Sequence, residues 1–237
     1  SDASPSAGDY YRVVTRIEAQ NLQRLAYGNA AAKSITLSFY VFCNLTGAFT
    51  VTFGQNDTTR MYSTTYTVDS ADTWEKKTIT IPGDASGVIN DDTGIGLEIG
   101  FFLGGGSNFT GGTQGSWAAN NNNMIGAGMT NNVLGSSSGD WRITGLQLEV
   151  SSVASDFEHE PVSVTLAKCQ RYLWVVPTAN GDYISMGLVN GSTATLNLLP
   201  LPVTMRAVPS LVLSAETHFG CIEIGVATRA TTALSLD

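Results

Sequence analysis

The sequence predicts an all-β protein, because short alternating segments recur along the chain without a long amphipathic helix. In the clearest segment, residues 35–43, apolar Ile35, Leu37, Phe39, Val41 and Cys43 alternate with Thr36, Ser38, Tyr40 and Phe42. Hydrophobic residues make up 43% of the chain and charged residues only 14%, which favours a packed core over disorder. With turn residues roughly every ten positions, these observations predict a β-sandwich and, within that class, a jelly roll.

Residues 1–156 are expected to form this sandwich. Strands are predicted over 10–19, 35–43, 49–53, 61–68, 74–81, 95–103, 116–119 and 141–150. In the last of them, one face carries Arg142, Thr144, Leu146, Leu148 and Val150, and its apolar members predict that this face is buried. Cys43 is in phase with the apolar face of its strand and is interpreted as a buried free thiol.

Residues 157–237 are expected to form a smaller β unit joined to the sandwich by a short helical turn. Pro161 suits the first turn of a helix, and Val162, Leu166 and Cys169 follow at helical spacing. Asn180-Gly181-Asp182 predicts a hairpin, and further strands are expected over 193–199, 211–215 and 221–227. Phe157 is expected to fill the seam between the units. A unit this short, with apolar strands, also predicts self-association.

The joint carries a family resemblance. Residues 143–161 (ITGLQLEVSSVASDFEHEP) and 166–174 (LAKCQRYLW) resemble a pattern of bacteriophage tail-fibre and tailspike receptor-binding proteins, and the resemblance extends to 35–42, 74–83, Trp117 and 201–209. It implies a jelly-roll carbohydrate-binding-like module followed by a C-terminal tip. It also implies a homotrimer that is made in the host cytoplasm, resides in the virion tail, contacts other tail proteins and binds a host surface glycan or receptor.

A sugar-binding surface needs an exposed aromatic ring with amide or hydroxyl groups nearby. Within the Gly/Asn-rich stretch 104–140, Trp117 is followed by Asn120, Asn121, Asn122 and Asn123, which are therefore the predicted ligand-binding residues. The alternative is that Trp117 only closes the core. Trp74 and Trp141 each open a strand and are interpreted as structural.

Other functions are disfavoured by composition and spacing. The net charge of −8, from 12 basic and 20 acidic residues without a basic cluster, argues against nucleic-acid binding. No apolar run reaches the roughly 18–20 residues of a membrane span, so no membrane insertion is expected. Three cysteines without a close pair exclude CxxC metal sites, and His159 and His218 fall in different units.

Catalysis is not expected, and no catalytic residue is assigned. Residues 135–139 fit GxSxG, but a strand follows where a nucleophile elbow requires a helix. Glu18, Asp91, Asp92, Glu98 and Glu149 could supply a glycosidase pair only at a suitable separation. No cofactor is expected, except that a structural calcium could be held by Glu18, Asp91, Asp92 and Asp140. The alternatives are a carbohydrate-active enzyme, its appended binding module, or a purely structural virion decoration protein.

Overall fold

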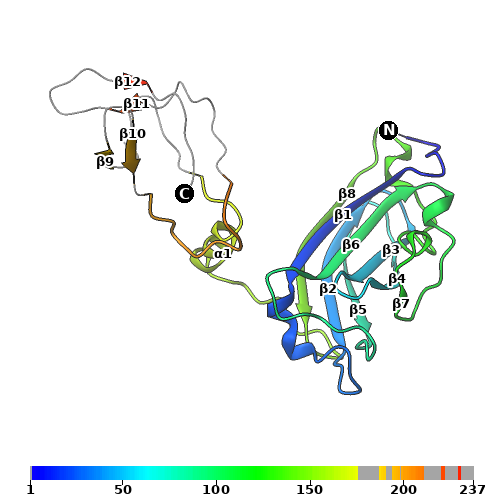
Figure 1. Ribbon diagram of the computed structural model, residues 1–237. Helices are drawn as coiled ribbons and strands as arrows, with labels where there is room; N and C mark the ends of the chain where they lie inside the picture. The colour runs from blue at the N-terminus through cyan, green and yellow to red at the C-terminus, as the bar shows by residue number, and fades with distance from the viewer. Residues whose placement is uncertain are drawn as a thin grey trace. The chain divides into compact units, whose positions relative to one another are not determined.

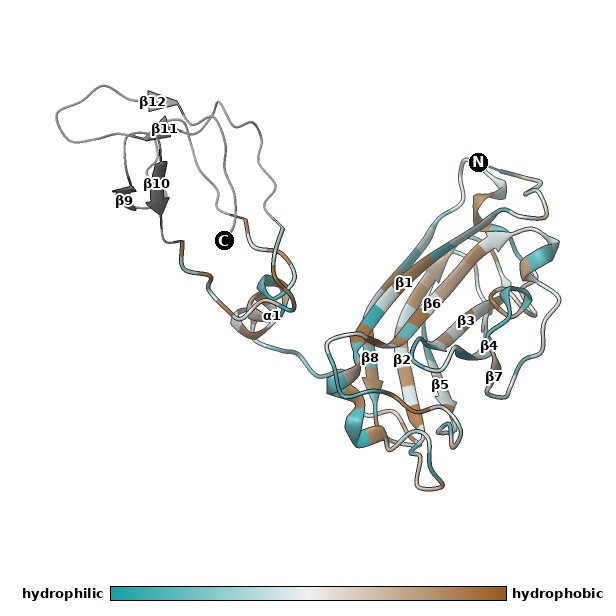
Figure 2. Cartoon of the chain, in the orientation of Figure 1, coloured by the Kyte–Doolittle hydropathy of each residue, from teal (hydrophilic) through white to brown (hydrophobic). Residues whose placement is uncertain are grey.

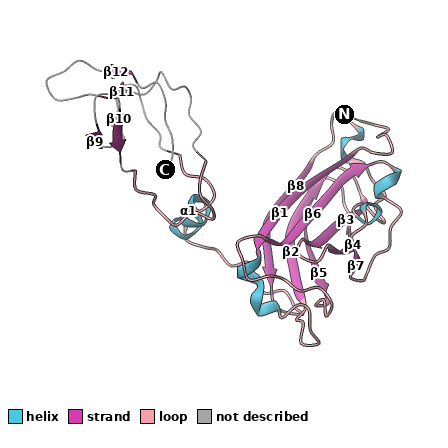
Figure 3. Cartoon of the chain, viewed as in Figure 1, coloured by secondary structure: helices cyan, strands magenta, loops and turns pink. Residues whose placement is uncertain are grey.

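The structure, a computed structural model, describes residues 2–175, 187–190, 194–197, 199–210, 220–221 and 229–230. The chain divides into two compact units, Ser1–Glu158 and His159–Asp237, just beyond the boundary predicted after Asp156. The first unit consists of two antiparallel sheets, as Figures 1 and 3 show. The predicted all-β class is therefore confirmed, whereas the jelly-roll topology stays a prediction.

One sheet has five strands in the order β1-β6-β3-β4-β7, and the other has three in the order β5-β2-β8. Their bounds are β1 Tyr10–Glu18, β2 Ile35–Cys43, β3 Gly47–Gln55, β4 Arg60–Val68, β5 Thr73–Ile81, β6 Ile95–Gly105, β7 Ala118–Ala119 and β8 Trp141–Glu149. Each predicted strand of the sandwich thus has a counterpart. In the three-stranded sheet, β2 is the central strand and pairs with β5 on one side and β8 on the other.

The core lies between the two sheets. All five alternating apolar residues of β2 are buried, and the Phe39 ring meets Tyr66 at 5.1 Å and Phe101 at 5.2 Å in edge-on contacts. Hydrophobic colour follows β2 and β6 in Figure 2. Cys43 is a buried free thiol as predicted, and burial raises its pKa. One face of β2 is therefore covered throughout, whereas the other is buried at Thr36 and Ser38 and open at Tyr40.

The face predicted as buried in β8 is wrong for its first half. Trp141 and Ile143 pack against the core, whereas Arg142 is exposed. The register with β2 shifts between Ser38 and Tyr40, where Gly145 adopts a positive φ of 59°. Such a bulge places two residues opposite one and reverses the phase of the strand, so that Leu148 and Val150 return to the core.

Two further segments complete the sandwich. The 3₁₀ helix η1 (Ala19–Leu25), which was not predicted, buries Ala19, Leu22 and Leu25, and this three-residue spacing fits a 3₁₀ helix. The Gly/Asn-rich stretch is fixed by buried apolar residues: Phe109, Met124 and Ile125 cluster with Met61 and Phe102 of the five-stranded sheet. Three short 3₁₀ helices lie in or next to it, namely η2 (Ser107–Phe109), η3 (Asn122–Met124) and η4 (Val133–Gly135).

The second unit contains the predicted helix, α1 (Val162–Gln170), with Pro161 at its N-cap and none of its residues buried. β9 (Gly187–Asn190) pairs with β10 (Ala194–Asn197), and β11 (Gly220–Cys221) pairs with β12 (Arg229–Ala230). The predicted turn at 180–182, His218 and the strand over 211–215 lie outside the described residues. Among the residues that are described, no helix is long and apolar enough to cross a bilayer.

Candidate functional site

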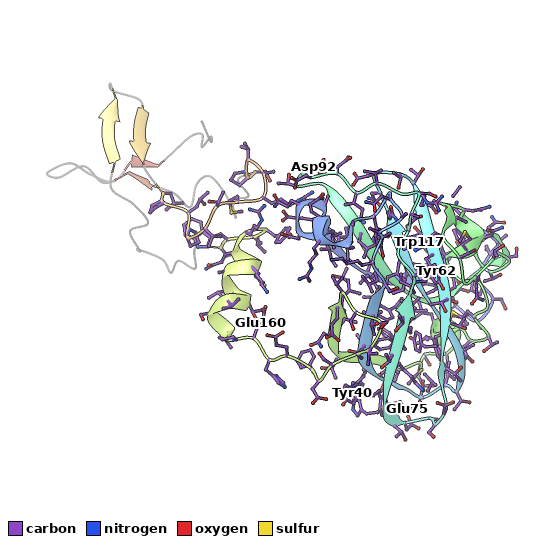
Figure 4. All side chains as sticks on the ribbon, turned by 90° about the horizontal axis from the view of Figure 1, so that it is seen from below. Tyr40, Tyr62, Glu75, Asp92, Trp117 and Glu160 are labelled. Atoms are coloured by element: carbon purple, nitrogen blue, oxygen red, sulfur yellow. The ribbon has the colours of Figure 1, made fainter. Side chains whose placement is uncertain are left out.

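Trp117, the predicted sugar platform, is half-buried against the core of the sandwich. Its indole N–H donates a 2.7 Å hydrogen bond to the Pro82 carbonyl. Its ring lies 5.7 Å from the Tyr62 ring and 5.8 Å from the Tyr27 ring, measured between centroids, and Figure 4 shows Trp117 and Tyr62 side by side. The side chain is therefore anchored at its polar end and covered by two aromatic rings, as expected for a residue that closes the core.

A buried ion pair fixes the backbone at Trp117. Arg60 donates to Asp84 at 2.5 and 3.1 Å and to the Trp117 carbonyl at 3.3 Å. Asp84 is 2% exposed and also accepts from Gln55 at 2.9 Å and from the Ser86 backbone N–H at 3.0 Å. Burial alone would raise the pKa of Asp84, but Arg60 and the other donors lower it overall. Asp84 is thus a carboxylate that organises this end of the sandwich.

Hydrogen bonds fix the backbone that carries the predicted asparagines after Trp117. The Asn120 N–H donates to the Thr59 carbonyl, and the Asn121 side chain accepts from the Asn123 N–H as the cap of η3. Within the described residues, no hydrogen bond links the Trp117 side chain to Asn120–Asn123. The amide of Asn121 already has a structural partner, while Asn122 is exposed. The sugar-binding role of this stretch therefore stays a prediction.

The carboxylates considered for calcium do not come together in one group of three or more among the described residues. Asp140 accepts two hydrogen bonds from Arg142, at 2.9 and 2.6 Å. Glu18 and Asp92 lie on neighbouring segments at the end of β1, where Gln20 donates to the Glu18 side chain and to the Asp92 carbonyl. Among the described residues there is no group of three or more His, Cys, Asp or Glu side chains that could hold a metal ion.

A different surface has the exposed aromatic rings that sugar binding requires. On the outer face of the three-stranded sheet, Phe42 of β2 lies opposite Trp74 of β5 and Arg142 of β8. Tyr40, next along the same face, lies opposite Lys76 of β5. Trp74 is 46% exposed and Tyr40 39% exposed. We call Tyr40, Phe42 and Trp74 the aromatic patch.

Ring contacts hold the aromatic patch together. The Phe42 and Trp74 centroids are 5.7 Å apart, and the Arg142 guanidinium lies 4.9 Å above the Phe42 ring. Hydrogen bonds to Asp140 orient this guanidinium and raise its pKa. Because neighbouring strands form the floor, the rings are held by rigid elements rather than by a loop. Figure 4 shows Tyr40 at the surface of the sandwich, far from Trp117.

Residues 151–158, which follow β8 and which we call the tether, lie along the end of this sheet face where the outward residues are polar. Thr36 donates to the Ser151 carbonyl at 2.8 Å, and Gln147 both donates to Ser155 Oγ at 3.1 Å and accepts from the Glu158 N–H at 2.7 Å. Phe157 is 39% exposed and lies beside Gly145, on the sandwich itself. Phe157 thus has a contact within the first unit, and its role in a seam between the units stays a prediction. The tether covers the polar end of the face and leaves the aromatic end open.

Sequence reasoning missed the aromatic patch, because Trp74 was interpreted as structural and Tyr40 and Phe42 as the outward residues of an alternating strand. A usable signal was present: two aromatic residues occupy successive outward positions of β2, where polar residues are the usual choice. Comparisons with protein-family models, curated proteins and solved structures found no match.

Proposed function

We propose that this protein is a phage tail-fibre component that recognises a host surface glycan through the aromatic patch. The observation that carries the proposal is the exposure of Trp74 and Tyr40 on one rigid sheet face. An aromatic ring stacks on the apolar face of a pyranose, and polar groups around it satisfy the sugar hydroxyls. Thr144 and Thr78, both exposed on the same face, supply such hydroxyl groups.

The patch suits a glycan better than the site predicted from sequence does. Trp117 has its indole N–H occupied by Pro82 and two other rings packed against it, so part of its surface is already engaged. Trp74 packs against Phe42 alone among the described rings, and nearly half of its surface is open. Stacking on an exposed ring therefore favours β5 over the Asn-rich stretch as the contact surface.

Assembly into a homotrimer remains part of the proposal. In the second unit, Val162, Val164 and Leu166 of α1 are exposed, and a shallow groove beside the helix is lined by Val164, Ala167 and Val203 among others. Exposed apolar side chains on a small unit favour burial against other copies of the chain. Light scattering is expected to give a mass three times that of the 25.0 kDa chain. A monomeric mass at micromolar concentration would contradict the trimer.

The binding proposal is tested with a glycan array of bacterial surface oligosaccharides and three variants. We expect Trp74→Ala and Tyr40→Ala each to weaken retention by roughly 1–3 kcal/mol, by analogy with the stacking of bases on aromatic side chains. Tyr10→Ala is the matched control, because Tyr10 is similarly exposed but lies on the other sheet. Retention that is unaffected by both patch substitutions would refute the site, and turnover of the glycan would indicate an enzyme instead.

A further inference from the structure

Lys76 places a positive charge beside the aromatic patch. It is exposed, lies opposite Tyr40 across the β2–β5 pair, and follows Trp74 by two residues on the same face. Adjacent strands are about 4.8 Å apart and a two-residue step covers about 6.8 Å. A ring stacked on Trp74 and Tyr40 would therefore lie within reach of the flexible side chain of Lys76.

Three carboxylates on the strands of this sheet or next to them have other partners. Asp140 pairs with Arg142, and Glu75, which neighbours Lys76 in sequence, pairs with Lys77. Glu149 lies at the far end of the face, where it accepts from the Ser155 hydroxyl at 2.5 Å and from its N–H at 3.0 Å. The hydrogen bonds from Ser155 lower the pKa of Glu149, with a smaller contribution from the charge of Lys76. Lys76 itself forms no ion pair with any described residue.

We propose that the aromatic patch selects a saccharide that carries a carboxylate, such as a hexuronic acid, and that Lys76 binds this group. The chain has a net charge of −8, so its average field repels an anionic ligand and only a local cation can reverse that preference. An ammonium next to the stacking rings supplies a charge-assisted hydrogen bond to a carboxylate. Arg142 reinforces the local positive potential, but its guanidinium is already engaged by Asp140. This inference rests on the proposed glycan-binding function.

The test uses the full chain on an array that presents neutral hexose oligosaccharides and the corresponding uronic-acid oligosaccharides at equal density. Lys76→Met keeps the apolar stem and removes the charge. Lys33→Met is the matched control, since Lys33 is also exposed but lies before β2, outside the aromatic patch. We expect the wild type to bind acidic members roughly two- to fivefold more tightly, the range of an exposed ion pair. Lys76→Met should lose this preference, whereas Lys33→Met should retain it.

The outcomes separate the two proposals. If wild type binds neutral and acidic members equally, or if Lys76→Met keeps the preference, the role of Lys76 is wrong while the glycan-binding function stands. If wild type binds no member of either class, both proposals fall. A preference that disappears in 0.5 M salt as well as in Lys76→Met would support the charge contact, because salt screens exposed ion pairs.

Discussion

Asp84→Ala is expected to be among the most destabilising single substitutions at the end of the sandwich that carries Trp117. It removes a buried carboxylate and leaves Arg60 and Gln55 without their acceptor. Breaking a buried ion pair from one side costs about 3–5 kcal/mol. Because the Arg60 side chain is 23% exposed and can regain water, we expect a loss of stability near the lower end, about 3 kcal/mol. Urea unfolding followed by circular dichroism measures this difference.

Asp69→Ala is the matched control, since Asp69 also pairs with a cation but is an exposed carboxylate. Exposed pairs contribute about 0–1 kcal/mol, so its effect should be small. The two variants should also differ in pH dependence. The folded-state pKa of Asp84 lies below its ordinary value of 3.8, so its contribution is present above that pH and is lost as the pH falls below it. The difference between wild type and Asp84→Ala should therefore shrink below pH 3.8.

The Arg60 contact with the Trp117 carbonyl gives this prediction a local readout. Without Asp84, the guanidinium loses its main partner and the backbone at Trp117 loses an anchor. Tryptophan fluorescence should then shift to longer wavelength in Asp84→Ala but not in Asp69→Ala. A stability loss equal to that of the control, or a difference that grows at low pH, would refute the assignment of Asp84 as the ionised centre of this network.

Three further predictions concern backbone strain, the tether and a half-buried carboxylate. Gly145→Ala should lower the free energy of unfolding in urea by about 1–2 kcal/mol, because φ is +59° and the added Cβ would lie 3.2 Å from the Tyr40 ring. Gly111→Ala is the control: an added Cβ there would have no atom within 4 Å, so the substitution should be nearly neutral. Phe157→Ala should cost less than the roughly 3–5 kcal/mol of a fully buried Phe, yet it should speed protease cleavage within 151–158; unchanged cleavage would show that the ring does not hold the tether. Glu75 has a pKa of about 2, because partial burial, which raises the value, is outweighed by hydrogen bonds from Lys77 and from the N–H groups of Asp69 and Ser70. Its contribution is therefore present above about pH 4.5 and lost as the pH falls toward 2, and Glu75→Gln should flatten the measured stability of the protein across that window.

Strand positions were predictable from sequence, because a strand that is buried on one face alternates apolar and outward-facing residues. In β2, the residues facing the core are all apolar, so the alternation identifies both the strand and its buried face. In β8, the same reasoning failed over Trp141 and Ile143. Alternation assumes a regular strand, and a glycine in the sequence does not reveal that it will adopt a positive φ and form a bulge.

The candidate site could not be predicted in the same way, because it is assembled by strand register. Phe42, Trp74 and Arg142 are distant in sequence and become neighbours only when β2 pairs with β5 on one side and β8 on the other. The Trp117–Asn123 segment looked more like a site because its aromatic and amide residues are close in sequence. In the fold, the ring of Trp117 packs against the core, and Asn121 caps a 3₁₀ helix.

Aromatic residues on the outward face of a strand are therefore more informative here than aromatic residues in a polar loop. A loop aromatic can turn inward and become core, as Trp117 does, because the loop backbone has the freedom to follow it. An aromatic side chain in a strand cannot turn inward in this way, because successive side chains point to opposite faces of the sheet. Since Val41 and Cys43 are buried, Phe42 must face outward. Exposing the apolar surface of such rings to water costs free energy unless a partner covers it. Tyr40 on β2 and Trp74 on β5 thus expose apolar surface on one sheet face, and this exposure is the physical reason why we propose a ligand site there.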